Sequence, residues 1–278
     1  MSIDYFDQLW QSKGPGKKSY KEGSAESWDS RVDEFSTDRP DERISKIIAL
    51  LEDKHLLHHN ATVLDIGCGP GRFAAEFAGK AHHVVGVDIS ANMLKNARQY
   101  SAGQNISNTE FIQLDWHDAD LSELQWQHQF SLVTAIMSPA IFSRESLEKI
   151  IAASSENGFL CHFVEHSDPI NDELKSLFFG QQHADIYGNK ALYCCLNYLW
   201  LRKLYPEITY LDTQRQSTRT IEEATRHYVN RWEMKIDLSG TQREEIKDIV
   251  QRRAKDGVVS ETIAARIACV YWRNKIYK

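Results

Sequence analysis

The 278-residue sequence lacks several features that would place it in a membrane or secreted class. No apolar run approaches the roughly 18 to 20 residues that cross a bilayer, so we expect no membrane-spanning helix. Residues 1–18 are polar and aromatic, unlike a secretory signal. The five cysteines are an odd number and form no CxxC pair. Together these absences predict reduced thiols and a cytoplasmic protein.

The sequence also lacks an excess of positive charge, because 33 Lys and Arg face 39 Asp and Glu. A net charge of −6 provides no overall field to hold a phosphate backbone, so nucleic acid is not the expected partner. Paired residues that could suggest a metal site lack the spacing that metal ligands need, so we expect no metal. These pairs are His58-His59, His82-His83 and Cys194-Cys195.

Short apolar strands alternate with helices up to about residue 166. We expect strands at residues 61–66, 83–88, 110–114, 130–137 and 159–164. Ser90 and Ser143 are expected to cap two of the intervening helices. This alternation indicates βαβ units and therefore a doubly wound, mostly parallel, Rossmann-like α/β sheet.

The last third of the chain breaks this alternation. We expect a strand over Ile208–Gln214, two helices, of which the second is opened by a Thr241-x-x-Glu244 capping box, and a long strand over Glu261–Arg273. The predicted fold is one domain with a seven-stranded sheet and an antiparallel strand near the C-terminus.

This domain is expected to have four parts. They are an N-terminal segment (1–36), a core of alternating strands and helices (37–166), a helical insertion (167–206), and closing strands and helices (207–278). Residues 1–36 and 167–206 are rich in aromatic residues and are expected to build a ligand pocket, although the aromatics of 176–205 could equally be the core of helices that cover the sheet.

The segment from Val63 to Phe73 is the most informative motif. An apolar strand enters a glycine-rich turn and then a helix, whose first amides can receive a carboxylate or phosphate. Asp88 lies about 20 residues further on, where a carboxylate can accept ribose hydroxyls of either NAD or S-adenosylmethionine. Arg72 occupies the position of the third glycine of the dinucleotide fingerprint, which disfavours NAD.

Three segments carry a more specific resemblance: Asp65-Ile66-Gly67-Cys68-Gly69-Pro70-Gly71, Gly86-Val87-Asp88-Ile89-Ser90 and Met93-Leu94-x-x-Ala97. They resemble the first two motifs of class I S-adenosylmethionine-dependent methyltransferases. Within that family the chain is similar to the small-molecule branch that includes quinone-methylating enzymes. The resemblance is concentrated in residues 61–115 and extends to about residue 166.

The resemblance implies S-adenosylmethionine as the cofactor and assigns roles along it. Asp65 would organise the methionine end, and Asp88 would take the ribose hydroxyls. The backbone-facing side would be lined by Gly67, Cys68 and Gly69, and the adenine would be packed by Ile89 and Met93.

Further residues follow from the same resemblance. Asp115 would accept from the adenine amino group, with Trp116 beside the ring, and Met137 would lie near the methionine moiety. Trp28 and Arg31 resemble an N-terminal segment that folds over the cofactor, although Trp28 could equally pack at the sheet edge.

The fourth strand departs from the family pattern. It often begins Phe-Asp-x-Val in the family, and here Ser131 replaces the aspartate, whose role there is mainly structural. The following segment, Met137 to Ile141, is not the Asn-Pro-Pro-Tyr type of loop found in enzymes that methylate base amines, which argues against a base-modifying role.

His162, Glu165 and His166 follow the fifth strand and are the candidates for a general base, because they are expected near the active-site rim. The alternative is that they are packed or solvated residues without a catalytic role. We predict in-line methyl transfer to a small-molecule acceptor, driven mainly by positioning. Residues 37–166 would be the cofactor-binding core, and the acceptor pocket would be built by a cap segment (1–36) and a lid insertion (167–206). A non-enzymatic cofactor-binding protein and an NAD-dependent oxidoreductase are the alternatives, and the sequence leaves open whether the chain is a monomer or a homodimer.

Overall fold

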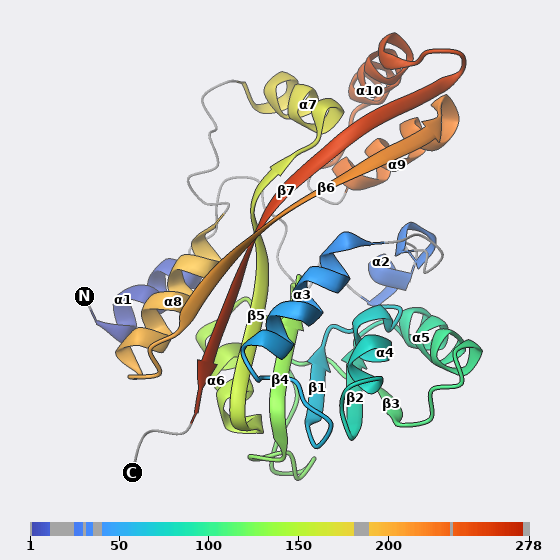
Figure 1. Cartoon of the computed structure of the whole chain (residues 1–278). Coiled ribbons are helices and arrows are strands. Elements are labelled where there is room, and N and C mark those ends of the chain that lie inside the picture. Colours follow the sequence, from blue (N-terminus) through green and yellow to red (C-terminus); the bar gives the residue numbers. More distant parts are fainter. Residues whose placement is uncertain are drawn as a thin grey trace.

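The computed structural model describes residues 2–11, 25–29, 32–35, 41–180, 189–233 and 236–274. Within them one sheet has seven strands in the order β3-β2-β1-β4-β5-β7-β6 (Figure 1). The strands are β1 (Thr62–Ile66), β2 (His83–Asp88), β3 (Thr109–Gln113), β4 (Phe130–Ile136), β5 (Ser154–Ser167), β6 (Glu207–Thr220) and β7 (Val258–Arg273). β1 to β5 are parallel, and β7 is antiparallel to both β5 and β6. The predicted Rossmann-like class with an antiparallel closing strand is confirmed.

Helices cover both faces of the sheet because its strands are apolar on both sides. One face is covered by α3 (Glu42–Asp53), α4 (Arg72–Ala78) and α5 (Ala91–Gly103), and the other by α1 (Ile3–Gln11), α6 (Arg144–Ala153) and α8 (Lys190–Leu201). The predicted caps are present, since Ser90 Oγ accepts from the Met93 amide at 3.0 Å and Ser143 Oγ from the Ser146 amide at 3.2 Å.

The last two strands are much longer than the central ones. β6 has 14 residues and β7 has 16, which correspond to about 46 and 53 Å at roughly 3.3 Å per residue, against about 17 Å for β1. Their far ends, with that of the 14-residue β5, project beyond the carboxyl edge of the central strands (Figure 1). α7 (Pro169–Phe179) follows β5, α9 (Ile221–Glu233) follows β6, and α10 (Gly240–Arg253) precedes β7. These helices bury a separate apolar core around Tyr228, Trp232 and Ile246.

The predicted start of α10 is wrong. The capping box is formed by Ser239 and Gln242, not by Thr241 and Glu244: Ser239 Oγ accepts from the Gln242 amide at 3.2 Å, and Gln242 Oε1 accepts from the Ser239 amide at 2.9 Å. Ser and Gln can form the same reciprocal capping box as Thr and Glu. Here they form it two residues earlier, so the helix begins at Gly240.

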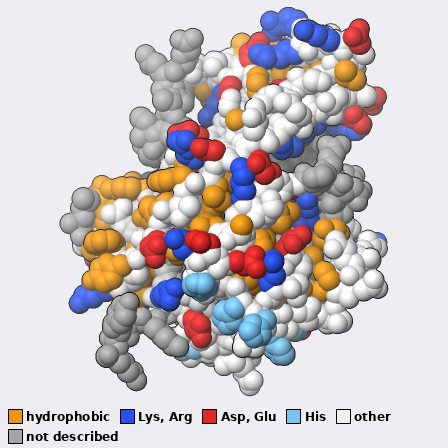
Figure 2. Space-filling view, viewed as in Figure 1, with side chains coloured by type: hydrophobic (Ala, Val, Ile, Leu, Met, Phe, Trp, Pro, Cys, Tyr) orange, Lys and Arg blue, Asp and Glu red, His pale blue; other side chains and the backbone are white. Residues whose placement is uncertain are grey.

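The two helices of the 167–206 segment lie far apart. α7 packs with α9 and α10, whereas α8 packs with α1 beside the N-terminus of the chain (Figure 1). Figure 2 shows hydrophobic side chains gathered on the flank formed by α1 and α8, where Trp200 and Tyr193 are exposed. No helix of the described ranges is long and apolar enough to cross a membrane.

Candidate active site

The turn between β1 and α4 depends on three glycines with left-handed backbone. Gly67, Gly69 and Gly71 have φ of 70°, 54° and 80°. A Cβ on Gly67 would lie 2.2 Å from Ser138 Oγ, and one on Gly71 would lie 2.7 Å from the Cβ of Ala97. A Cβ on Gly69 would meet no atom within 4 Å. The turn is therefore tightly packed on two sides and open at Gly69, where a ligand can approach the backbone.

Asp88 ends β2 beside this turn. Its Oδ2 accepts from the Gly69 amide and its Oδ1 from the Ser90 amide, both at 2.9 Å. Burial raises the pKa of the Asp88 carboxyl, although both amides oppose that effect. A carboxylate offers about four acceptor positions, so two remain for the hydroxyls of a ribose. The geometry fits the cofactor role that the sequence resemblance implies.

Asp65, at the end of β1, is a buried carboxyl beside the same cavity. Thr134 Oγ1 donates to it at 2.8 Å, and none of the described Lys, Arg or His side chains forms an ion pair with it. Burial raises the pKa of Asp65 to about 7, and the neighbouring Asp88 acts in the same direction. An amino group on a ligand would supply the missing positive charge, which is the chemistry of a methionine moiety.

The short helix α2 (Ala25–Asp29) is anchored over the cofactor side of the cavity. Asp29 Oδ1 accepts from Ser90 Oγ and, at 3.0 Å, from the Asn92 amide at the start of α5. A carboxylate is favourable at a helix N-terminus because free amides and the helix dipole are positive there. This contact places Trp28 in the cavity wall, whereas Arg31 lies outside the described residues.

These groups open into one cavity of about 770 Å³, which lies at the upper end of the roughly 300 to 1,000 Å³ typical of ligand sites. Most of the predicted site residues line it. They are Trp28, Asp65, Gly67, Cys68, Gly69, Asp88, Ile89, Met93, Trp116, Met137 and His166.

Asp115 and Trp116 follow β3 with different surroundings. Trp116 is almost fully buried, and its Nε1 donates to the Ser146 carbonyl at 3.0 Å, which fixes the indole at the cavity edge. Asp115 Oδ1 accepts from the His117 amide at 2.9 Å and lies outside the cavity lining. The structure therefore gives Asp115 a turn-stabilising contact and brings Trp116 to the site.

Of the three base candidates, His166 is the one that lines the cavity. An irregularity in the β5–β7 ladder between Phe163 and Glu165 interrupts the alternation of side chains, and Phe163 and His166 both face the cavity with their rings 5.5 Å apart. Strand alternation places His162 on the opposite face from Phe163. Glu165 is exposed, 3.8 Å from Arg266. His162 and Glu165 thus lie outside the cavity lining.

Met137 has a strained backbone at the centre of the cavity wall. It ends β4 with a φ of 53°, which is uncommon for a residue other than glycine, and its amide donates to the Cys161 carbonyl at 2.8 Å. Its sulfur lies 3.4 Å from an Arg43 guanidinium nitrogen. Arg43 also pairs with Asp41 and lies over the Phe163 ring, 5.8 Å from its centroid.

The outer wall of the cavity comes from β6 and α9, which the sequence analysis did not connect with the site. It contributes Arg215, Arg219, Glu223, Arg226, His227 and Asn230. The two segments expected to build the acceptor pocket differ in what they contribute to the cavity. Trp28 and Phe35 line the cavity from the first segment, but none of the described residues of 167–206 does. The physical reason is the length of β6, which carries α9 past the sheet edge into the place predicted for a lid.

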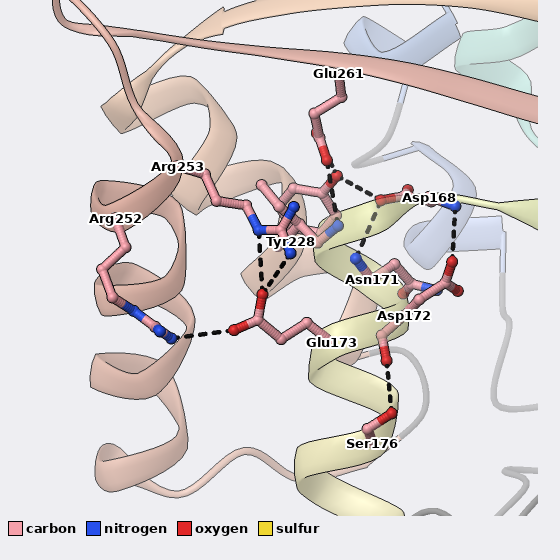
Figure 3. Close-up of polar contacts among 10 residues, drawn as sticks. Asp168, Asn171, Asp172, Glu173, Ser176, Tyr228, Arg252, Arg253 and Glu261 are labelled. Carbon is pink, nitrogen blue, oxygen red and sulfur yellow. Dashed lines mark hydrogen bonds and ion pairs between the residues drawn. The ribbon is translucent and has the colours of Figure 1, made fainter.

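A buried polar network holds α9 in this position (Figure 3). Asp168 accepts from Tyr228 Oη at 2.8 Å and from Arg231 at 2.7 Å, and it caps α7 by accepting from the Asn171 amide at 3.1 Å. Tyr228 Oη also lies 2.7 Å from Glu261 Oε2 on β7. The network therefore joins α7, α9 and β7, so that the outer wall has a fixed relation to the sheet.

Ser131, which replaces the family's aspartate, has a structural role. Its Oγ accepts from the Thr62 amide at 2.9 Å and lies 3.1 Å from the Thr62 carbonyl, while its own amide donates to Thr62 Oγ1 at 3.1 Å. These bonds join the beginnings of β1 and β4, away from the cavity. The replacement therefore removes no group from the site.

Comparison with known proteins gives the family. The sequence pattern described as "Methyltransferase domain" matches residues 57–225, more than half of the chain. A candidate methyltransferase of Geobacillus sp. (strain WCH70) is 26% identical over 130 residues, which are 45% of this chain and 50% of that protein. The ubiquinone biosynthesis O-methyltransferase of Aromatoleum aromaticum is 36% identical over 78 residues, 27% of this chain and 30% of that protein. The matches thus span half or less of these relatives.

The fold has a counterpart among solved structures. A candidate methyltransferase from Bacillus halodurans C-125 aligns with 82% of this chain and 98% of its own, with a TM-score of 0.50 and 18% sequence identity. This similarity shows the shared fold. The family match covers residues 57–225, which include the glycine turn and Asp88. The chain belongs to the family of S-adenosylmethionine-dependent methyltransferases.

Proposed function

We propose that the chain transfers the methyl group of S-adenosylmethionine to a small molecule bound between the glycine turn and α9. The observation that carries this proposal is that one continuous cavity is lined by Gly69 and Asp88 and also by the polar residues of β6 and α9. Its volume leaves room for a small acceptor beside the residues assigned to the cofactor. The name of the Aromatoleum relative, an enzyme of ubiquinone biosynthesis, supports an acceptor of this size.

The described side chains divide the cofactor among them in this proposal. Asp88 accepts the ribose hydroxyls, Asp65 faces the methionine amino group, and Ile89 and Met93 pack on the adenine. Trp28 covers the bound cofactor, because α2 is held at the start of α5 by Asp29. Asp115, on the turn that follows β3, accepts from the adenine amino group in this proposal, beside its contact with the His117 amide.

S-adenosylmethionine, when bound, supplies a methyl group that its sulfonium makes electrophilic. The chain then contributes positioning of the acceptor and exclusion of water, which can provide most of the acceleration of an in-line displacement. His166 is the proposed general base where the acceptor carries a proton. Burial lowers the pKa of His166, as does the nearby Arg231, so the ring is neutral at pH 7 and can accept a proton.

The test uses S-adenosylmethionine with a labelled methyl group. Purified protein is incubated with a cell extract separated into a low-mass filtrate and a macromolecular retentate, and transfer is compared with that of Asp88→Ala. We expect a labelled low-mass product, separated by chromatography from the unreacted S-adenosylmethionine, in the reaction with the filtrate, and no such product with the variant. Label in the RNA or protein of the retentate would contradict a small-molecule acceptor.

The same experiment addresses the non-enzymatic alternative. Titration calorimetry measures S-adenosylmethionine and S-adenosylhomocysteine binding in parallel, with NAD as the control ligand. Micromolar binding of both adenosyl ligands with no labelled product in either fraction would favour a cofactor-binding protein without transfer. The oxidoreductase alternative predicts binding of NAD, which the family membership argues against.

A further inference from the structure

The two sides of the cavity carry side chains of opposite charge. Its inner side, at the ends of β1 and β2, carries the carboxyls of Asp65 and Asp88. Its outer wall, on β6 and α9, carries the guanidinium groups of Arg215, Arg219 and Arg226. The cationic half of a methyl donor matches the acidic side, so the basic side is the part of the cavity that remains for the acceptor.

The arginines converge because of strand and helix periodicity. Arg215 and Arg219 are four residues apart on β6, so both side chains leave the same face of the strand. α9 follows β6 directly and lies beside it (Figure 1). Arg226 is in the second turn of α9 and lines the same cavity. Three positive charges from two adjacent elements therefore line one wall.

These arginines lack the carboxylate partners that other arginines of the chain have. Arg231 pairs with Asp168, Arg266 with Asp212, and Arg243 with Glu233. Within the described residues, Arg215 and Arg226 form no hydrogen bond or ion pair, and Arg219 donates to the neutral Ser217 hydroxyl at 2.6 Å..

The acidic residue on this wall, Glu223, is engaged by the helix end. Its Oε2 accepts from the Thr220 amide at 2.9 Å, while Thr220 Oγ1 accepts from the Glu223 amide at 3.2 Å. This reciprocal pair is a capping box that begins α9. One carboxylate shared with a helix terminus does not balance three guanidinium groups.

Burial and the neighbouring positive charges lower the pKa values of Arg215 and His227 on this wall. Burial lowers the pKa of Arg215, and Arg43 and Arg219 lower it further. Burial also lowers the pKa of His227 to about 3, with Arg219 and Arg231 acting in the same direction. A bound anion would oppose these effects, because it favours the positive form of every group around it.

We propose that the methyl acceptor is an anion, whose carboxylate or phosphate group binds to Arg215, Arg219 and Arg226. The inference rests on the proposed methyl transfer, since it names the acceptor class for the same cavity. Guanidinium groups bind both kinds of oxyanion through paired, charge-assisted hydrogen bonds. Anchoring the anionic end on β6 and α9 directs the remainder of the molecule toward Met137 and His166, at the inner end of the cavity.

The binding test uses inorganic phosphate and succinate as separate probes, titrated calorimetrically into protein saturated with S-adenosylhomocysteine. We expect millimolar binding of at least one probe, and the tighter one identifies the phosphate or carboxylate source. Arg215→Gln and Arg226→Gln should each weaken this binding about tenfold or more, because each removes charge-assisted hydrogen bonds. Arg243→Gln, on the exposed face of α10, is the matched control and should leave it unchanged.

Two results would overturn the inference. One is the absence of phosphate and succinate binding in protein that still binds S-adenosylhomocysteine. The other is binding that Arg215→Gln and Arg226→Gln leave at the level of the Arg243→Gln control. Circular dichroism and S-adenosylhomocysteine affinity show that each variant remains folded.

The charge of the labelled product separates this inference from the proposed function. Retention of the low-mass product on an anion-exchange column supports both, whereas a labelled neutral or cationic product supports methyl transfer and overturns the anionic acceptor. Absence of any labelled product, together with anion binding that depends on Arg215 and Arg226, would overturn the proposed function and leave the anion site standing.

Discussion

Replacing Asp168 with alanine is expected to destabilise the chain far more than removing a second acid of the same helix, Glu173. Asp168 is fully buried and accepts from Tyr228, Arg231 and the Asn171 amide. Glu173 forms ion pairs with two arginines of α10, but all three side chains are at least one third exposed (Figure 3). The two variants therefore compare a buried network with a surface one.

The magnitude follows from the partners left behind. Removing one side of a buried ion pair costs about 3 to 5 kcal/mol, because the remaining charge loses its partner. Here Arg231 loses its carboxylate, whereas the Tyr228 hydroxyl keeps Glu261 Oε2 at 2.7 Å. Arg231 is 28% exposed and can turn toward solvent, so we expect the lower end, about 3 kcal/mol, which includes the lost cap of α7. Exposed ion pairs contribute about 1 kcal/mol or less, which sets the expectation for Glu173→Ala.

Urea denaturation followed by circular dichroism measures the difference. With an m-value of about 3 kcal/mol/M, Asp168→Ala should lower the midpoint by about 1 M, and Glu173→Ala by about 0.3 M or less. Tyr228→Phe, which removes only the hydroxyl, should lie between them. Equal shifts for Asp168→Ala and Glu173→Ala would refute the assignment of α9 positioning to the buried network.

The pH dependence of the free energy of unfolding, compared between the wild type and Asp168→Asn, provides a second check. Burial raises the pKa of Asp168, but Arg231, the Asn171 amide and Tyr228 together hold it below the ordinary value of 3.8. A carboxyl with a lowered native pKa stabilises the fold above the unfolded pKa, and this stability is lost as the pH falls through the native pKa. The difference between the wild type and Asp168→Asn should therefore be constant from pH 5 to 7 and decrease below about pH 3.8.

Three further predictions concern the cofactor side of the cavity. Gly67→Ala should weaken S-adenosylhomocysteine binding about tenfold or more by calorimetry, because its Cβ would lie 2.2 Å from Ser138 Oγ on a backbone with φ of 70°, whereas Gly103→Ala, in open space, should bind normally. S-adenosylmethionine affinity should fall as the pH drops below about 7, by up to roughly tenfold per pH unit, because protonation makes the Asp65 carboxyl, whose pKa is raised to about 7, neutral. The same dependence of affinity on pH in Asp65→Asn as in the wild type would contradict this. Trp28→Ala should accelerate S-adenosylhomocysteine release about tenfold in stopped-flow measurements by removing an aromatic wall, and an unaltered release rate would show that α2 does not cover the ligand.

The central sheet could be predicted from the sequence because its signals are local. Each strand from β1 to β4 is a short apolar run, and each helix that follows has a cap or a glycine turn within a few residues. Ser90 illustrates this: its hydroxyl accepts from an amide three residues away, so the sequence alone contains both partners. The same holds for Gly69 and Asp88, whose contact follows from the short spacing of strand, turn and strand within one βαβ unit.

The extent of β6 could not be predicted in this way. The predicted strand ended at Gln214, whereas β6 continues to Thr220 through Arg215, Gln216, Ser217, Thr218 and Arg219. A strand segment that leaves the core needs no alternating apolar residues, because water covers part of it, and its partner on β7 supplies the hydrogen bonds. A polar segment that pairs with a neighbouring strand therefore cannot be distinguished from a loop by its own sequence.

The choice among the base candidates depends on a single irregularity in β5. Regular alternation would place His162, Val164 and His166 on one face, with Phe163 on the other. The shift in the β5–β7 register between Phe163 and Glu165 instead brings His166 to the face of Phe163. Neither residue type nor spacing reveals this shift, so sequence reasoning could name the three candidates but not select one.

The two halves of the cavity therefore differ in how the sequence encodes them. The cofactor half is built mainly within residues 65–137, with α2 added from the N-terminal part, so a match to residues 57–225 and a glycine motif identify its ligand. The acceptor half depends on contacts such as Tyr228 with Asp168, 60 residues away, and with Glu261, 33 residues away. These contacts orient α9, and α9 with β6 presents the arginines. The proposed charge of the acceptor is thus a property of the assembled wall, because Arg215, Arg219 and Arg226 line one cavity only once β6 and α9 are in place.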